Sequence, residues 1–254
     1  MDFYRDMGYM ALCVGKGDLA GSTMFLLEET KKRGLRPLSS NLRYKGKAVF
    51  EPYGIFDVND TKVGVLAVTS PELNQRIKAD AVEVLDPSAQ LKSLVPELKN
   101  RVDVIILLSN LSEFEDRKLP STVDGIDIII ESGPGKQRYQ PLKVGSTYFL
   151  RGDIKGRSVG KVGVKLSSGG GIQGLDNELH QLSASLPVDE AATRKIEKLK
   201  QKHSAHKAVT IRHSSAKNPF LESIEKAKKS KVKGGPYQSD NSTKKPVSEV
   251  REPE

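Results

Sequence analysis

Val-Asp-Val-Ile-Ile-Leu-Leu, at residues 102–108, is the stretch of sequence that decides the fold class. An apolar run with so little interruption is typical of a strand inside a sheet that is covered on both faces. Residues 62–69 and 126–130 have the same character. Residues 86–100 start with Asp-Pro and repeat leucine and valine at helical spacing. Strands that alternate with helices in this way predict a layered α/β domain.

Weaker patterns extend this alternation in both directions along the chain. Residues 11–14 predict a short buried strand, and residues 21–33 predict an amphipathic helix. Toward the other end, residues 159–166 alternate as a strand does, and residues 179–186 predict one more strand.

The 254 residues divide into a balanced body and a basic end. Residues 1–188 contain 25 Lys and Arg against 23 Asp and Glu, whereas residues 189–254 contain 16 against 9. We therefore predict a domain over residues 1–188, a basic helical extension over 189–225 and a disordered Lys/Ser/Pro-rich tail over 226–254. The balanced body argues against a nucleic-acid surface that covers the whole protein.

Cys13 is the only cysteine of the chain. A single cysteine excludes an intrachain disulfide and any zinc or iron–sulfur site built from several cysteines, and no Cys-x-x-Cys-His motif is present to attach a c-type haem. The apolar surroundings of Cys13 predict a buried strand thiol. No stretch approaches the roughly 18–20 apolar residues of a membrane-spanning helix, and the first residues do not have the pattern of a signal peptide.

A series of short motifs occurs in an order that is typical of one protein family. The motifs are Tyr-Met-Ala-Leu-Cys-Val-Gly-Lys-Gly-Asp-Leu at 9–19, Pro-Leu-Ser-Ser-Asn-Leu at 37–42, Phe-Glu-Pro-Tyr at 50–53, Lys-Val-Gly-Val at 62–65, Thr-Ser-Pro at 69–71, Asp-Pro at 86–87, Leu-Val-Pro-Glu-Leu-Lys at 94–99, Asp-Val-Ile-Ile-Leu-Leu-Ser at 103–109 and Gly-Ile-Asp-Ile-Ile-Ile at 125–130. Over about residues 9–166 the chain thus resembles the metallophosphoesterase domain of bacterial 5'-nucleotidases and UDP-sugar hydrolases, in the calcineurin-like phosphoesterase superfamily. The resemblance implies a four-layer α/β/β/α sandwich that lacks its first strand-helix unit.

The resemblance also implies a centre of two divalent metal ions at the strand ends, where they activate water and clamp phosphate oxygens. The family has Gly-Asn-His followed by an acid where this chain has Gly-Lys-Gly-Asp at 15–18. Ser-His-Leu-Gly is replaced by Ser-Asn-Leu-Ser at 109–112, and Gly-Gly-His-Ser-His by Glu-Ser-Gly-Pro-Gly at 131–135. The family's first Asp-x-His pair and second aspartate lie upstream of anything this sequence contains. The degenerate positions are Lys16, Gly17, Asp18, Asn110, Gly133 and Gly135.

These replacements leave no residue to which catalysis or metal binding can be assigned. The leading hypothesis is a non-catalytic binding or scaffolding module. One alternative is an active phosphoesterase of nucleotide catabolism that uses substitute ligands such as Asp18 and Asn110. A second alternative is a polyanion-binding protein that uses its basic tail. Lys16 and Ser109 are expected anion contacts, because a cation restores positive charge where a metal would sit; a solvent-facing loop lysine is the competing interpretation.

The expected partners are a nucleotide or another phosphate-bearing ligand, and an acidic protein or a cytochrome that contacts the basic tail. The cytochrome is expected because Asn-Pro-Phe-Leu at 218–221 resembles the junction at which some relatives carry multihaem segments. Specific nucleic-acid binding is not expected, since the tail has few aromatic residues for stacking. The resemblance implies a periplasmic or cell-surface location.

Overall fold

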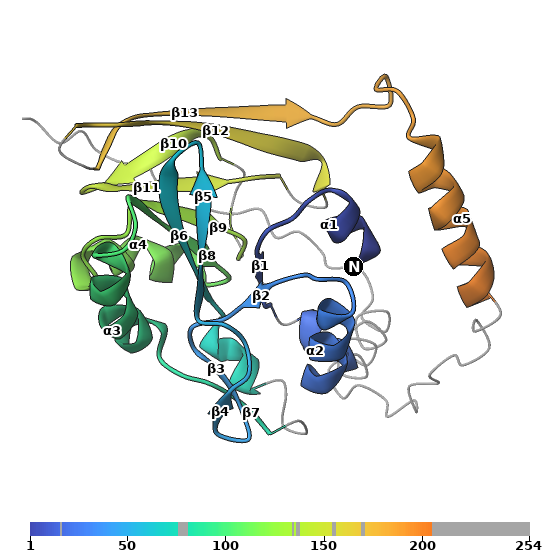
Figure 1. Ribbon diagram of the computed structural model, residues 1–254, viewed down its shortest axis with the longest axis horizontal. Helices are drawn as coiled ribbons and strands as arrows, with labels where there is room; N and C mark the ends of the chain where they lie inside the picture. The colour runs from blue at the N-terminus through green and yellow to red at the C-terminus, as the bar shows by residue number, and fades with distance from the viewer. Residues whose placement is uncertain are drawn as a thin grey trace, which may run out of the picture. The chain divides into compact units, whose positions relative to one another are not determined.

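A six-stranded mixed sheet forms the centre of the computed structural model (Figure 1). Its strand order is β10-β11-β9-β8-β6-β5, and the four inner strands are parallel to one another. Both edge strands run antiparallel to their neighbours. The three apolar runs of the sequence are the inner strands β6, β8 and β9, as predicted. The bounds are β5 (Tyr53–Val58), β6 (Thr61–Val68), β8 (Val104–Ser109), β9 (Ile128–Glu131), β10 (Arg138–Val144) and β11 (Thr147–Arg151).

The structure describes residues 1–15, 17–75, 81–133, 135, 138–153, 156–168 and 171–204. The chain divides into two units, Met1–Asp189 and Glu190–Glu254. The second unit is described only through the helix α5 (Glu190–Ser204), so the expected tail over 226–254 lies outside the described residues. Within the described ranges, no helix combines the length and the apolar character that a membrane crossing requires.

Two helices cover one face of the six-stranded sheet, α3 (Pro87–Lys99) and α4 (Glu113–Thr122) (Figure 1). The Asp86 carboxylate caps α3 by accepting a hydrogen bond from the Ala89 N–H at 2.7 Å. Alternate residues of the strands point into this side and are fully buried there. The core of this face comprises Leu66, Val68, Leu91, Val95, Leu98, Ile105, Leu107, Leu111, Leu119, Val123, Ile126, Ile129 and Phe149.

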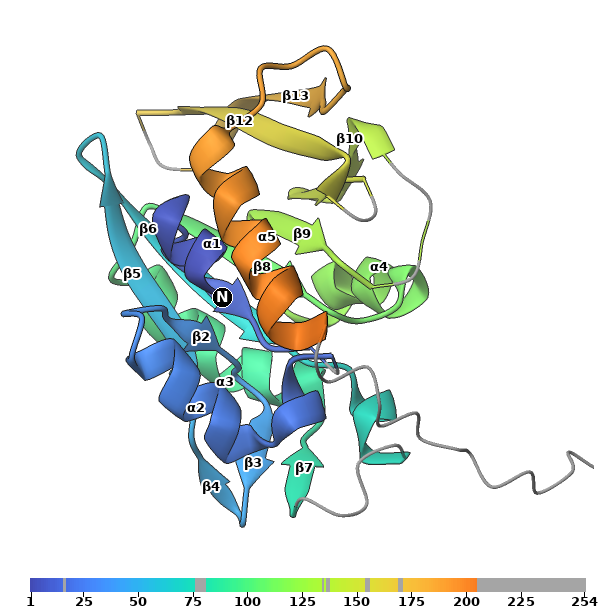
Figure 2. The ribbon, with the colours of Figure 1, turned by 90° about the vertical axis from the view of Figure 1, so that its right-hand side faces the viewer.

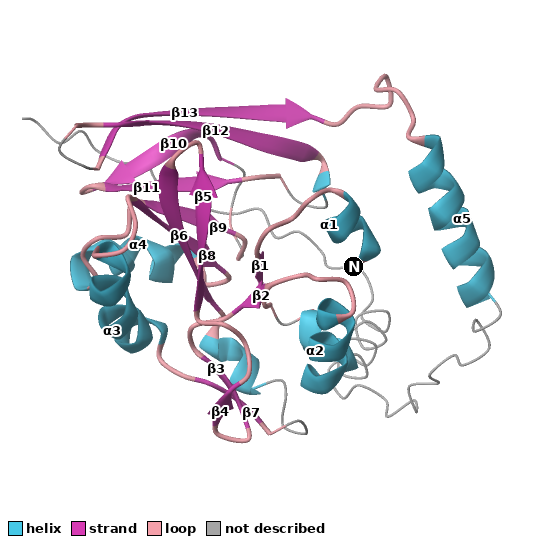
Figure 3. Cartoon of the chain, in the orientation of Figure 1, coloured by secondary structure: helices cyan, strands magenta, loops and turns pink. Residues whose placement is uncertain are grey.

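Two separate two-stranded sheets lie on the opposite face (Figure 3). The strands β1 (Leu12–Cys13) and β2 (Pro37–Leu38) pair in parallel, and Leu38 packs against the six-stranded sheet. The strands β12 (Ser158–Leu166) and β13 (Ile172–Gln181) form an antiparallel hairpin. These two small sheets together make a second β layer.

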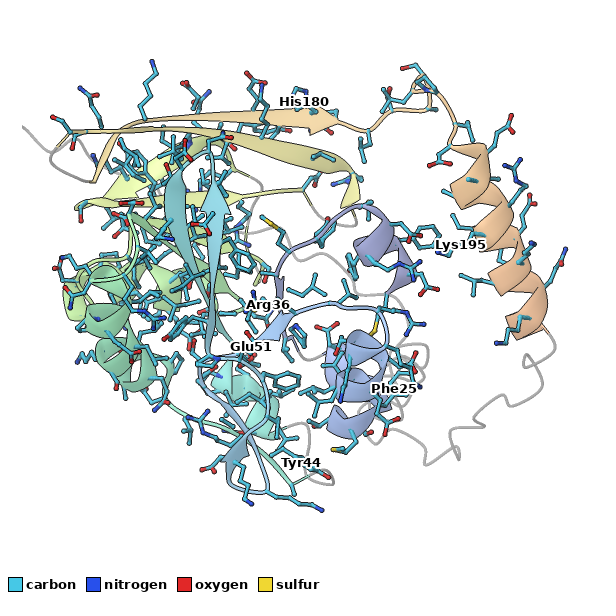
Figure 4. All side chains as sticks on the ribbon, in the orientation of Figure 1. Phe25, Arg36, Tyr44, Glu51, His180 and Lys195 are labelled. Atoms are coloured by element: carbon cyan, nitrogen blue, oxygen red, sulfur yellow. The ribbon has the colours of Figure 1, made fainter. Side chains whose placement is uncertain are left out.

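The outer layer on this side is the helix α2 (Thr23–Lys31), which packs through Leu26 against Val14 at the end of β1. Beside β2, the side chains of Arg36 and Glu51 form an ion pair (Figure 4). The layers therefore follow the predicted order, helices, sheet, sheet and helix. The remaining elements are α1 (Asp2–Asp6), the 3-10 helices at Asp18–Gly21 and Pro71–Gln75, and the three-stranded sheet β4-β3-β7 formed by Lys47–Ala48, Leu42–Tyr44 and Val82–Val84.

One predicted strand is misplaced, because pairing rather than local pattern sets its bounds. The sequence predicts a strand over 179–186, whereas β13 ends at Gln181. Gln181 pairs with Ser158, the first residue of β12, so β12 has no further strand residue with which the chain beyond Gln181 could pair. The strand β5 was not predicted; it reaches β6 through a two-residue turn with positive φ at Asn59 and Asp60.

Candidate functional site

Three loops meet at the carboxyl ends of β1, β8 and β9, where ligands of open α/β sheets bind. The Ser132 N–H donates to the Ser109 carbonyl at 2.8 Å, which joins the loop after β9 to the end of β8. The Asn110 amide donates to the Ser132 hydroxyl at 3.4 Å. A Cβ at Gly15, after β1, would lie 3.5 Å from that same amide. The fold therefore brings together the three loops that contain the sequence-predicted site residues.

The loop after β1 is closed by Asp18. Its carboxylate accepts a hydrogen bond from the Gly15 N–H at 2.8 Å, so one oxygen is used inside the loop. Gly17 is exposed, and a Cβ there would meet nothing within 4 Å. Glycine at 17 is thus not required by the packing. Lys16, the expected anion contact, lies outside the described residues.

Gly133 and Gly135 stand where the family resemblance leads us to expect histidines. A Cβ at Gly133 would lie 1.7 Å from the Leu111 carbonyl oxygen, so the loops after β8 and β9 touch through their backbones. A Cβ at Gly135 would lie 2.6 Å from the Arg151 guanidinium carbon. The Arg151 guanidinium also donates to the Gly133 carbonyl. The Leu111 backbone leaves no room for an imidazole at position 133, and at position 135 an imidazole would have to displace the Arg151 side chain.

A cluster of buried charges beneath these loops was not found from the sequence. The side chain of Glu131 is 0% exposed and pairs with Arg138 at 3.2 Å and with Arg151 at 3.3 Å. Arg151 and Glu131 form an ion pair whose atoms are not aligned for a hydrogen bond. The Nε and Nη2 atoms of Arg151 therefore have no hydrogen-bond partner among the described residues. A signal was present, because Glu131 and Arg151 each end an apolar strand, where a charged residue is unusual.

Asp116 belongs to the same buried region. The Ser109 hydroxyl donates to one oxygen of its carboxyl group at 2.5 Å, and the other oxygen has no partner among the described residues. Burial raises the pKa of Asp116 to about 7; the nearby charge of Glu131 adds to the increase, and the Ser109 hydrogen bond opposes it. Asp116 therefore holds a proton well above the pH at which an exposed aspartate loses it.

A buried polar network fixes the neighbouring end of β1. The Thr69 hydroxyl donates to the Val14 carbonyl at 2.7 Å. The Asn41 amide donates to the Thr69 carbonyl at 2.8 Å and accepts from the Thr69 N–H at 2.9 Å. The thiol of Cys13 lies 3.5 Å from the Val68 carbonyl, and burial raises its pKa to about 12. The thiol is therefore uncharged and unreactive at neutral pH, in keeping with the predicted strand position.

These residues do not fit the two-metal centre that the resemblance implies. No group of three or more His, Cys, Asp or Glu side chains in the described part of the chain is placed to hold a metal ion. Asp18 accepts from its own loop, Glu131 is paired with two arginines, and burial favours the neutral form of Asp116. No reaction step through a bound metal follows from this arrangement.

Comparison with curated proteins identifies partial relatives. The chain is 26% identical over 117 residues to a 5'-nucleotidase of Vibrio cholerae, which is 43% of this chain and 21% of the relative. It is 27% identical over 143 residues to a snake venom 5'-nucleotidase of Gloydius brevicauda. This match covers 50% of this chain and 23% of the relative. The chain thus matches about a fifth of the length of these relatives. No family model matches the sequence.

Solved structures cover much more of the chain. The sulfate thiohydrolase SoxB of Thermus thermophilus superposes with a TM-score of 0.73 at 20% identity, over 81% of this chain and 39% of its own. A 5'-nucleotidase precursor, also of Thermus thermophilus, superposes with a TM-score of 0.69 at 21% identity, over 80% of this chain and 45% of its own. The calcineurin-like phosphoesterase YfkN of Bacillus subtilis superposes with a TM-score of 0.65 at 16% identity, over 79% of this chain and 72% of its own. The chain therefore has a 5'-nucleotidase-like metallophosphoesterase fold and spans less than half the length of the first two of these neighbours.

Proposed function

We propose that this chain is a metallophosphoesterase-fold domain that acts as a non-catalytic binding or scaffolding module. The observation that carries the proposal is the close approach of the Leu111 backbone to Gly133, which excludes a histidine side chain at that position of the loop after β9. A histidine ligand would require this loop to move away from Leu111 and from the Arg151 guanidinium. The buried pairing of Arg151 with Glu131 supports the proposal, because it ties the same loop to the sheet.

The partners and the location extend this proposal. We include a nucleotide or another phosphate-bearing ligand at the strand ends, an acidic protein or a cytochrome at the basic tail, and a location in the periplasm or at the cell surface. The relatives named 5'-nucleotidase support the first of these. The tail contacts involve residues 189–254, of which 205–254 lie outside the described residues.

A metal and activity assay tests the proposal. Purified chain is given Mn²⁺, Co²⁺ or Zn²⁺ together with AMP or p-nitrophenyl phosphate, and metal binding is measured separately by calorimetry. We expect hydrolysis at the rate of the protein-free control and no stoichiometric metal. Metal-dependent turnover that is lost in Asn110→Ala, together with stoichiometric metal binding, would establish the active alternative and overturn the proposal. Val159→Lys, an exposed change on β12, is the matched control for that variant.

A further inference from the structure

The helix α5 combines a large positive charge with exposed apolar side chains. It is one continuous helix (Figure 2), and its 15 residues contain five Lys and Arg against two Glu, a net charge of +3. Ile196 and Leu199 are 41% and 40% exposed, although side chains of this kind are mostly buried in folded proteins. The exposure of two large apolar side chains on one helix raises the question of what covers them.

The apolar residues of α5 form one narrow stripe. Ala192, Ile196 and Leu199 follow one another at intervals of four and three residues, so a turn of about 3.6 residues places them on one side of the helix. This spacing is typical of the seam along which two helices pack lengthwise against each other. The stripe is narrower than the apolar face of a helix that covers a globular core.

The charged residues of α5 are distributed unequally around this stripe. The same helical geometry places Lys195 and Lys202 along one border of the stripe and Lys200 along the other. Both glutamates of α5 lie on the opposite side of the helix, where Glu190 pairs with Arg194 at 3.1 Å. A partner that covers the stripe therefore meets lysine at both borders.

Charge complementarity decides which partner fits this surface. A helix whose apolar residues are flanked by Glu or Asp would bring opposite charges to Lys200 and Lys202. A second copy of α5 would place lysine against lysine, which opposes self-association. An anionic membrane also attracts lysine, but helices that lie in its surface have a broad apolar face with bulky Trp, Phe or Leu side chains. The stripe of α5 has only Ile196 and Leu199 as large apolar residues.

We propose that the stripe of α5 docks an acidic amphipathic helix of another protein. Leu or Ile side chains of that helix pack against Ile196 and Leu199, and its Glu or Asp side chains pair with the lysines at the borders of the stripe. The inference rests on the proposed contact of the basic tail, residues 189–254, with an acidic protein, and it names the site and the form of the partner. A helix of this length is marginally stable alone, so docking also stabilises α5.

Peptide binding to the full chain tests this proposal. The probe is a fluorescein-labelled peptide with three repeats of Glu-Ile-Ala-Ala-Leu-Glu-Gln, and binding is measured by fluorescence anisotropy. The first control has three repeats of Glu-Ala-Ile-Glu-Leu-Ala-Gln, which keeps the composition but places Ile and Leu on different faces. The second control is the probe with every Glu exchanged for Lys. We expect both controls to bind at least about tenfold more weakly than the probe.

The peptides distinguish a failure of this inference from a failure of the proposed function. Equal binding of the two acidic peptides would overturn the helix stripe and leave the contact between the basic tail and an acidic protein in place. No binding of either acidic peptide would overturn both. The metal and activity assay tests the non-catalytic assignment separately, because it does not involve α5.

A double variant removes the apolar stripe. Ile196→Gln combined with Leu199→Gln introduces a good helix former at two exposed positions, so the chain should fold with unchanged helix content by circular dichroism. We expect this variant to bind the probe at least about tenfold more weakly than the unchanged chain. Binding at the unchanged affinity would contradict docking on the stripe.

A second pair of variants tests the borders of the stripe. Lys200→Gln combined with Lys202→Gln should weaken binding of the probe by about threefold or more. Arg194→Gln combined with Lys198→Gln is the matched control, since it removes the same charge from residues that do not border the stripe. Equal effects of the two double variants would mean that net charge alone drives binding, and the proposed surface would be wrong.

Three further measurements separate the possible occupants. Amide hydrogen exchange over residues 196–202 should slow by about tenfold or more with the probe bound, and unchanged exchange there overturns docking on α5. Vesicles of phosphatidylglycerol and phosphatidylcholine test a lipid surface by cosedimentation, and light scattering of the chain alone tests self-association. Cosedimentation or a dimer that the Ile196 and Leu199 double variant abolishes would identify a membrane or a second copy as the occupant, and either result overturns the proposal.

Discussion

The two faces of the six-stranded sheet are built by the same strands but are covered to different extents. On one face, Ile105 and Leu107 of β8 are almost completely buried under α3 and α4. On the other face, Ile106 between them is only partly buried and borders an apolar cavity of about 570 Å³ that reaches β12. Successive residues of one strand therefore meet a close-packed core on one side and an incomplete layer on the other.

This difference follows from where the segments that cover each face lie in the sequence. The helix-covered face is closed by elements that follow directly in sequence, because α3 precedes β8 and α4 follows it. The other face depends on β1–β2 and on β12–β13, which come from distant parts of the chain. A face that is covered by distant segments is closed only where those segments reach it.

The largest expected effect compares Ile105→Ala with Ile106→Ala. Ile105 is 2% exposed in the helix-covered core, so its truncation should lower the free energy of unfolding by about 2–5 kcal/mol. Ile106 already borders a cavity, and its truncation should cost less than about 2 kcal/mol. Urea unfolding of both variants measures the difference. Equal losses would mean that the two faces are equally well packed.

A pH effect of similar size is expected at Asp116, a buried residue of α4 on the closed face. Its pKa is raised to about 7 in the folded chain, whereas an aspartate in an unfolded chain has a pKa of about 3.9. The raised pKa therefore stabilises the fold fully below about pH 4, and this stabilisation is lost as the pH rises through about 7. Between these two pH values the free energy of unfolding falls by an amount on the order of 4 kcal/mol.

Asp116→Asn tests this effect, because an amide resembles the neutral acid and does not ionise. The free energy of unfolding of the variant, relative to the unchanged chain, should rise between about pH 4 and pH 7 and then remain constant. Urea unfolding at a series of pH values measures it. Parallel curves for the two proteins would show that Asp116 ionises normally in the fold.

The smallest expected effect comes from adding one methylene group on each face. Val65→Ile points into the cavity and should stabilise the chain by about 0.5–1 kcal/mol. Val95→Ile, in the fully buried core of α3, should destabilise it by about 1–3 kcal/mol through overpacking. Thermal unfolding compares the two changes. A loss of stability in both variants would contradict an open cavity in solution.

Much of the closed face could be predicted from the sequence, whereas other elements could not. The strands β6, β8 and β9 and the helix α3 have strong local patterns. The sequence of α4 is rich in charge and contains Pro120, and β10 alternates weakly around Pro141, so neither has a clear pattern. Their structure is stabilised by the sheet against which they pack.

The candidate site likewise has residues that could be identified from the sequence and residues that could not. The family resemblance identified Gly17, Asn110, Gly133 and Gly135 as positions without the expected ligands, because those positions follow recognisable strands. It did not indicate the pairing of Glu131 with Arg151, since the two residues become neighbours only when β9 pairs with β11. Nor did it indicate the burial of Asp116.

The sequence by itself determined the parallel core of the sheet and the helices α2 and α3, because apolar periodicity depends on residues only a few positions apart. Tertiary structure alone decided the backbone contact between Gly133 and Leu111, the buried charges below it and the cavity beside β12. Each of these brings together segments that are distant in the chain, and their spacing is set by the pairing and packing of whole strands.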